Sequence, residues 1–443
     1  MFSSHADHIT ADMFRKAVLQ TNTRRKEDAA KKLAFFNDEQ SSFILAQINA
    51  FYKQPERVLP VSVNIVRKII KALSTVYLND AVRTVTGTKQ DQDILAAIDD
   101  TASLPVKMKL ANRYSKLLGT ILLRPVWRNG TMDIDVLTPD ILDVYCADSP
   151  EYIKAVMVTQ YSDSGKNTEV EYSLWTPEVI QRLDYRYNLI SEEPNPYLTL
   201  PFVAVFSSPP TDTYWLPGAN DLVLIQDAVN KRLSDLWFTL DYQSAGVFFV
   251  KGAKAPTGKA GTVADISVGP SSAIYLPEHG EVGFAAPKAP VQDTLDAIER
   301  LMKWAALTNG LPAGSMSLDP TVQSGVSRIV ANSELSELRM DDIAHFARVE
   351  CQLFDIIRVV WNTHNTQRKI SEAASLTVDF YDPKPVVSPA DKVKEWQGLL
   401  ELGLISLTDI LIERNPDLTR EDAQRELLRI RDENTEFQNL NLA

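Results

Sequence analysis

The side chains best able to bind a transition metal or to act as nucleophiles in this 443-residue sequence are five histidines and two cysteines. They are His5, His8, His279, His345, His364, Cys146 and Cys351. None lies in an HExxH motif or in a Cys/His cluster with zinc spacing, and no GxSxG motif indicates a nucleophile. His5 and His8 are neighbours, but they lie near a terminus. We therefore expect no catalytic residue, no metal ligand and no cofactor.

A lysine-bearing turn at residues 252–262, GAKAPTGKAGT, comes nearest to a phosphate-binding loop. Five residues separate Gly252 from Gly258 where the P-loop pattern has four, and Ala260 stands where Ser or Thr would bind Mg²⁺. The pattern favours a flexible, mildly basic turn over a nucleotide site. The lysines in and just before this turn have no acidic neighbour in the sequence: Lys251, Lys254 and Lys259.

Two charged segments each allow two interpretations. Asp133 and Asp135 share one face of a strand in TMDIDVLTPD, where they could hold a cation, although alternation on a solvent face is the favoured explanation. The run RRKEDAAKK at residues 24–32 mixes signs and predicts a solvated helix face, with a nucleic-acid arm as the alternative.

The overall charge excludes a DNA-wrapping protein of the basic kind. Lys plus Arg is 46 and Asp plus Glu is 58, which gives a net charge of −12. The cysteines lie far apart, as expected of buried thiols in a reducing compartment. No apolar run spans a bilayer and the first residues lack the order of a signal peptide, so we expect a protein that stays in the cytosol where it is made.

The hydrophobic pattern changes from helical to strand-like along the first half of the chain. SSFILAQINAFYKQ and VSVNIVRKIIKALSTVYL predict helices, the second with Val63, Val66, Ile70 and Leu73 at helical spacing. From about residue 121, short β-branched runs joined by RNG and DSGKN predict hairpins, and LPFVAVFSSPP is the last strand candidate. The class is α+β with an antiparallel sheet.

The second half predicts two helices that flank a small β insert, then a loop and a very long helix. The two flanking helices are predicted at residues 220–245 and 291–307, and the long helix is predicted at residues 325–362. The loop at residues 310–327 is polar and contains nothing that would anchor a core. A strand, SLTVDFYDPKP, and helices broken at Gly403 and Pro416 complete the chain. Each of the three helices has an expected apolar face, listed here in chain order: Leu222, Ile225, Val229, Leu236 and Leu240 for the first; Val291, Leu295, Ile298, Met302 and Ala305 for the second; Phe346, Val349, Leu353, Ile356 and Val360 for the long helix.

The order of these segments resembles the portal proteins of tailed bacteriophages, and those of long-tailed phages in particular. The resemblance is carried by LPFVAVFSSPP, DLVLIQDAVNKRLSDLWFTLD, TLDAIERLMKWAALTNGLP, QSGVSRIVANSEL and SPADKVKEWQGLLELGLISLTDIL, in that order. It implies a ring of roughly twelve subunits around a channel at one capsid vertex, through which DNA is packaged and ejected.

The resemblance also divides the chain into parts. It implies a wing and N-terminal region at 1–216, stem helices at 217–245 and 291–307, a clip at 246–290, a tunnel loop at 308–324, a long helix with the wing's return strand at 325–387, and a helical crown at 388–443.

By the same resemblance, the tunnel loop faces DNA and the clip docks partner proteins. Residues 310–327 contain no Lys or Arg and one acid, Asp319, as a loop that must let phosphates slide requires. Arg328 is the best candidate for a phosphate contact, although a helix cap or an inter-subunit ion pair is the favoured alternative. The expected loop residues are Ser315, Ser317, Thr321, Gln323, Ser324 and Arg328, and the clip residues are Lys251, Lys254 and Lys259.

The implied partners are other copies of the chain, double-stranded DNA, the terminase large subunit, head-completion proteins, and the major capsid and scaffold proteins. The implied location is the virion's portal vertex, and the host cytoplasm during assembly, without a membrane. Two rival hypotheses remain: a phage adaptor or baseplate-like protein that never encloses DNA, and a nucleotide-dependent enzyme acting on nucleic acid.

Overall fold

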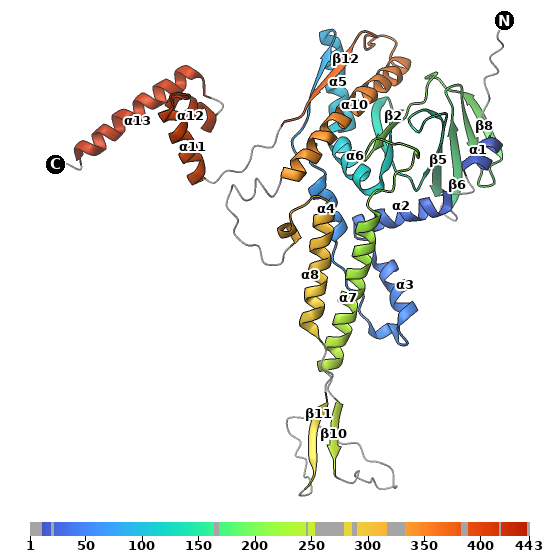
Figure 1. The fold of residues 1–443 in the computed structure, drawn as a ribbon. Coiled ribbons are helices and arrows are strands. Elements are labelled where there is room, and N and C mark those ends of the chain that lie inside the picture. Colours follow the sequence, from blue (N-terminus) through green and yellow to red (C-terminus); the bar gives the residue numbers. More distant parts are fainter. Residues whose placement is uncertain are drawn as a thin grey trace. The chain divides into compact units, whose positions relative to one another are not determined.

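The computed structural model describes residues 11–18, 22–163, 168–244, 247–252, 279–285, 290–316, 333–381, 389–415 and 418–440 (Figure 1). The chain divides into two compact units. The first comprises residues 1–320 and 334–381, and the second residues 321–333 and 382–443.

The first unit opens with helices and then alternates helices with strands. Its N-terminal helices are α1 (Ala11–Val18), α2 (Asn22–Asn37), α3 (Ser41–Phe51), the 3-10 turn η1 (Pro55–Arg57), α4 (Ile65–Leu73), α5 (Lys89–Ala102) and α6 (Leu104–Leu118). Its later helices are α7 (Asn220–Ser244), α8 (Val291–Thr308), the 3-10 turn η2 (Ala313–Met316) and α10 (Ser333–His364).

The strands of this unit form four antiparallel sheets in the described residues. They are β1 (Val82–Thr86), β2 (Thr120–Arg128), β3 (Thr131–Leu137), β4 (Leu142–Cys146), β5 (Ile153–Asp163), β6 (Thr168–Trp175), β7 (Val179–Leu183), β8 (Leu189–Pro194), β9 (Val203–Phe206), β10 (Val247–Lys251), β11 (Glu281–Ala285) and β12 (Ser375–Asp379). The sheet orders are β3-β2-β9, β4-β5-β6-β7-β8, β1-β12 and β10-β11. The expected α+β class with antiparallel sheets is confirmed.

The RNG turn is the hairpin that the sequence predicts. Asn129 and Gly130 both have positive φ, 50° and 79°, as a two-residue turn between twisted strands requires, and β2 pairs with β3 from Arg128↔Thr131 onward. The second predicted hairpin pairs β5 with β6, and its turn lies outside the described residues.

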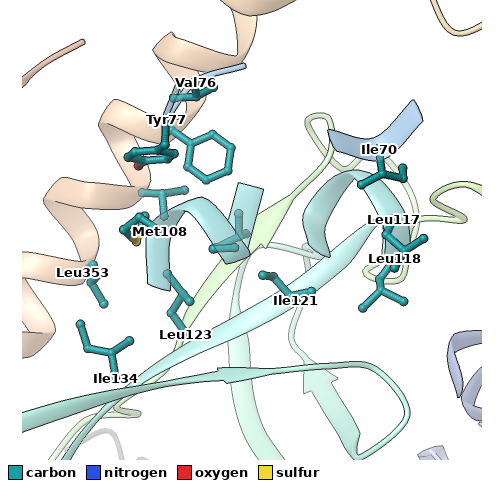
Figure 2. Packing of buried hydrophobic residues seen from close by; sticks show 14 of the residues in the cluster. Ile70, Val76, Tyr77, Met108, Leu117, Leu118, Ile121, Leu123, Ile134 and Leu353 are labelled. Carbon is teal, nitrogen blue, oxygen red and sulfur yellow. The ribbon is translucent and has the colours of Figure 1, made fainter. Parts of the chain in front are cut away.

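A single large core joins the helices to the three-stranded sheet. Met108 from α6 and Leu353 from α10 are buried in it with side chains from α4, β2 and β3. Figure 2 shows these side chains converging from segments far apart in the sequence, among them Ile70, Leu117, Leu118, Ile121, Leu123 and Ile134. The long helix α10 is thus part of a core within one chain, and at 32 residues it is about 48 Å long.

The predicted solvated helix face at residues 24–32 holds for Arg24, Glu27 and Asp28, which are exposed, but it is wrong for Arg25 and Lys32. Arg25 of α2 donates to the carbonyl oxygens of Pro139 and Leu142 at 2.6 and 2.7 Å, and it pairs with Asp143. Lys32 is buried and donates to the carbonyl oxygen of Pro217. Long basic side chains bury their apolar stems, so a mixed charge run can pin a helix to its neighbours instead of facing water.

The predicted helix around VSVNIVRKIIKALSTVYL begins later than its first apolar residue. Asn64 caps α4 by accepting from the Arg67 N–H, so Val63 lies outside the helix and is exposed. Val66 and Ile70 are buried as predicted.

The second unit contains three helices in its described residues: α11 (Pro389–Glu401), α12 (Leu407–Arg414) and α13 (Arg420–Leu440). Gly403 has φ +68° and follows α11, and the Gly403 and Leu404 N–H groups donate to Leu400 and Leu399. This is the predicted helix break. Ser406 and Asp409 then form a reciprocal capping box that starts α12.

Candidate functional site

Helices α7 and α8 run side by side in opposite directions (Figure 1). They cover the residues predicted to be stem helices, and this pair is called the stem below. Asn309, just after α8, donates to the Asp221 carboxylate in the first turn of α7 at 3.3 Å. At the other end the chain passes through the β10-β11 hairpin, in which Val247 pairs with Ala285. The order helix, β insert, helix is therefore as predicted.

A stripe of polar side chains fixes α7 against the N-terminal helices. Gln226, Asn230 and Ser234, spaced four residues apart, are almost fully buried. Gln226 Oε1 accepts from the Ile65 N–H at 2.7 Å, and its amide donates to Asn230 at 2.8 Å. Asn230 then donates to Gln40, and Ser234 accepts from the Val61 N–H. Buried amides with satisfied partners fix a single register for the helix.

This stripe corrects the predicted apolar faces of the stem. Leu222, Val229, Ile298 and Ala305 are buried as predicted, whereas Leu240 and Leu295 are exposed. The sequence analysis missed the polar stripe, although the recurrence of Gln226, Asn230 and Ser234 every four residues was a visible signal.

Large apolar side chains remain exposed on both stem helices. Leu224 and Trp237 of α7 are 68% and 49% exposed, and Trp304 and Leu307 of α8 are 59% and 54% exposed. Contiguous apolar patches on a surface mark contact sites, and Trp304 and Leu307, three residues apart, share one face of α8. The stem thus presents apolar surface that its own chain does not cover.

The end of α8 is fixed to the start of α10. Gly310 has φ +71°, and a Cβ added there would lie 2.9 Å from Leu338 Cδ1. Leu311 and Met316 follow and are buried. The expectation that residues 310–327 contain nothing to anchor a core is therefore wrong for these two side chains. The Leu311 N–H donates to the Ala306 carbonyl oxygen at 2.9 Å, and Met316 is the last residue of η2.

The predicted site residues are only partly described. Ser315 is exposed in η2, and its N–H donates to the Pro312 carbonyl oxygen at 2.9 Å. Lys251 is exposed at the end of β10, with its ammonium 3.9 Å from Glu281, so it is not unopposed as the sequence suggested. The remaining predicted residues lie outside the described residues: Ser317, Thr321, Gln323, Ser324, Arg328, Lys254 and Lys259.

A buried charge network holds α10 to β1. Glu350 accepts from Arg83 at 2.7 and 3.0 Å and from the Tyr77 hydroxyl at 2.8 Å. Burial and the Glu350 charge raise the pKa of Tyr77 well above its ordinary value. Burial lowers the pKa of the Arg83 guanidinium, but bonding to Glu350 outweighs it and the net shift is upward. Both groups keep their ordinary protonation at neutral pH, which suits a structural role.

His364 and the paired aspartates have structural partners, whereas the buried Nε2 of His345 has no hydrogen-bond partner among the described residues. His345 on α10 is half-buried, and burial lowers the pKa of its imidazole. His364 stacks on Trp127 with ring centroids 5.3 Å apart. Asp135 accepts from Arg124 and Arg128, and Asp133 from Arg128, so these carboxylates already have cationic partners.

Two searches were negative within the described residues. No group of three or more His, Cys, Asp or Glu side chains is arranged to hold a metal ion there. In the same residues, no helix combines the length and apolar character needed to cross a bilayer.

The chain is similar to known proteins at the level of family and solved structure, and no curated protein matches it. One similar chain comes from the "Neck of empty GTA particle computed with C6 symmetry", with 12% identity, TM-score 0.46, and 81% of this chain and 92% of that chain covered. Another comes from the "Virion of native gene transfer agent (GTA) particle", with 13% identity, TM-score 0.44, and 84% and 91% covered. A family model, "Phage portal protein, SPP1 Gp6-like", matches residues 49–439. The chain therefore belongs to the phage portal protein family, SPP1 Gp6-like.

Proposed function

We propose that the chain assembles into a closed ring of roughly twelve copies that serves as a conduit for double-stranded DNA at one vertex of the capsid. It acts in packaging and ejection and resides in the virion after assembly in the host cytoplasm. Membership of the portal family supports this proposal.

The observation that carries the ring is the uncovered apolar surface on both stem helices. Leu224, Trp237, Trp304 and Leu307 are exposed. They lie on two different helices. In a closed ring, each subunit contacts its two neighbours through two different surfaces, and α7 and α8 could supply one surface each. A closed ring buries both faces of every copy.

The parts of the chain take the roles that the resemblance implies. Helices α7 and α8 form the stem, residues 246–290 the clip that docks the terminase large subunit and head-completion proteins, and residues 308–324 the tunnel loop. Because Leu311 and Met316 are buried, the DNA-facing part of that loop begins after them. Capsid and scaffold proteins surround the wing, and residues 388–443 form the crown.

The conduit has no catalytic site of its own, and a separate ATPase supplies the energy for packaging. Purified protein should therefore not hydrolyse ATP. Hydrolysis that is lost in Lys259→Ala would contradict this proposal and favour a nucleotide-dependent enzyme.

The test is single-particle electron microscopy of the purified full chain, with mass measurement on the same sample. A ring whose central hole is wider than roughly 20 Å admits duplex DNA and supports a conduit. A ring with a narrower hole contradicts the conduit and favours an adaptor.

The double variant Trp304→Ser, Leu307→Ser tests the stem as the interface, and Tyr185→Ser, an exposed residue after β7, is the control. We expect the stem variant to remain a folded monomer and the control to assemble. Full assembly of the stem variant would show that the contact lies elsewhere.

A further inference from the structure

A cavity of about 300 Å³ lies where α2 meets the start of α7. Its lining includes Arg24, Arg25 and Lys32 from α2, Trp215 and Pro217 from the connection to α7, and Asn220, the first residue of α7. The only acidic residue in the lining is Asp28. In a chain with net charge −12, this is a local excess of positive charge.

Lys32 is a buried cation without an ion pair. The residue is 6% exposed, and its ammonium donates to the Pro217 carbonyl oxygen. Among the described residues no carboxylate lies within 4.0 Å of it, whereas the adjacent Lys31 pairs with Asp227 at 2.6 Å. Buried ammonium groups are normally paired with an anion, since the loss of hydration is otherwise uncompensated. Burial lowers the pKa of the Lys32 ammonium, because a charged group loses hydration there.

The two arginines differ in how much of their charge is already neutralised. Arg25 pairs with Asp143 at 2.7 Å and stacks over Trp215 with its guanidinium carbon 4.0 Å from the ring centroid. Asp143 is also shared with Lys26 at 2.6 Å, so one carboxylate serves two cations. Arg24 is exposed and has no hydrogen bond or ion pair to any described residue.

The start of α7 adds a further attraction for an anion. Asn220 opens a helix of 25 residues, and the N-terminal end of such a helix carries partial positive charge, which Asp221 in the first turn offsets in part. The Asn220 N–H itself already donates to the Gly218 carbonyl oxygen at 3.0 Å. Pro217 links Lys32 to this helix end. Its carbonyl oxygen accepts from the Lys32 ammonium, and it lies three residues before Asn220 in the sequence.

We infer that this cavity binds a small molecule bearing a phosphate group, with Lys32 and Arg24 as the cationic contacts. A tetrahedral oxyanion supplies further acceptors for the Lys32 ammonium, beyond the Pro217 carbonyl oxygen, and a partner for the free Arg24 guanidinium. The volume is at the lower end for small-molecule sites, so a mononucleotide fits better than a larger ligand. The depth at which Lys32 lies favours a small ligand over the backbone of duplex DNA.

The probes are inorganic phosphate and AMP, added to the full chain while its melting temperature is recorded against chloride at equal ionic strength. At ten times Kd, the ligand should raise Tm by about 2 °C, and the shift should saturate. Arg24→Gln and Lys32→Met should each abolish it. Lys53→Met, at an exposed lysine outside the lining, should keep it.

Phosphate also stabilises proteins by exclusion from their surfaces, so the variants decide the outcome. An equal rise in wild type and Arg24→Gln would overturn the site. If Lys32→Met does not fold, Arg24→Gln alone decides, because the exposed Arg24 holds no other described group. In a parallel arm, a fluorescent duplex that binds through Arg24 and is not displaced by AMP would assign the cavity to DNA and overturn the small ligand. Ring assembly has no part in this test.

Discussion

The core around α10 buries charged side chains, whereas the stem helices α7 and α8 leave large apolar side chains exposed. In the core, Arg83 and Glu350 are buried as a hydrogen-bonded pair, so even charged groups are satisfied within one chain. On the stem, Trp237 and Trp304 are about half exposed. The difference shows that the Arg83–Glu350 pair is satisfied within one chain, whereas α7 and α8 carry large apolar side chains that the chain leaves exposed. Each prediction below strengthens or breaks that contrast.

The largest effect should come from the buried ion pair. Glu350→Gln removes the buried anion that compensates Arg83 and leaves only the partly exposed Asp99 at 3.3 Å, and we expect a loss of about 3 kcal/mol in the free energy of unfolding. Denaturant titration with linear extrapolation measures it. Glu299→Gln, which removes a half-exposed pair with Lys303 on α8, is the control, with a loss of roughly 0.5 kcal/mol or less. Equal losses would erase the distinction between the two regions.

The polar stripe of the stem should give the next effect. Gln226→Leu removes the acceptor of the Ile65 N–H and the donor to Asn230 Oδ1, and we expect a loss of about 2 kcal/mol in the free energy of unfolding. Leu224→Gln, two residues earlier on the exposed face, should change stability by less than about 0.5 kcal/mol. The same titration compares them, and a neutral Gln226→Leu would mean that the stripe does not hold α7.

A smaller effect should appear with pH at His345. Burial lowers the pKa of its imidazole below 6.5, so the unfolded chain binds the proton more readily. The stability contribution is therefore present at neutral pH and is lost as the pH falls below 6.5. In His345→Gln, the decline between pH 7 and acid should be shallower than in wild type. If the unfolding free energies of wild type and variant fall in parallel with pH, His345 does not cause the loss of stability in acid.

The smallest effect on the monomer should come from the side chain with the greatest role in assembly. Trp304→Ser removes an exposed ring, so the unfolding free energy of the isolated chain should change by less than about 1 kcal/mol. A larger loss would show that Trp304 stabilises the monomer, and it would weaken the contrast between wing and stem.

The sequence predicted elements with strong local signals. The RNG turn, the stem helices and the break at Gly403 follow from positive-φ residues and 3.6-residue periodicity, both of which act locally. The capping box that starts α5, Thr88 with Asp91, is an equally local signal that the sequence analysis overlooked.

The sequence could not reveal which charges would be buried. Arg25 and Lys32 look solvated in RRKEDAAKK, and only the approach of residues far along the chain gives them carbonyl partners. The cavity at α2 and α7 was missed for the same reason. The candidate site could be predicted only to the level of stem, clip and loop, because faces such as that of Leu295 depend on tertiary packing.

The pairing of β1 with β12 has a consequence for how the chain folds. Val82 pairs with Asp379, so the strand that completes this sheet is synthesised long after its partner. Contacts this distant in sequence close slowly, because a long loop must lose its conformational freedom first. During translation, β1 waits with an open edge until the ribosome has delivered α10 and β12. The final closure of the wing therefore follows, and cannot precede, synthesis of the entire stem.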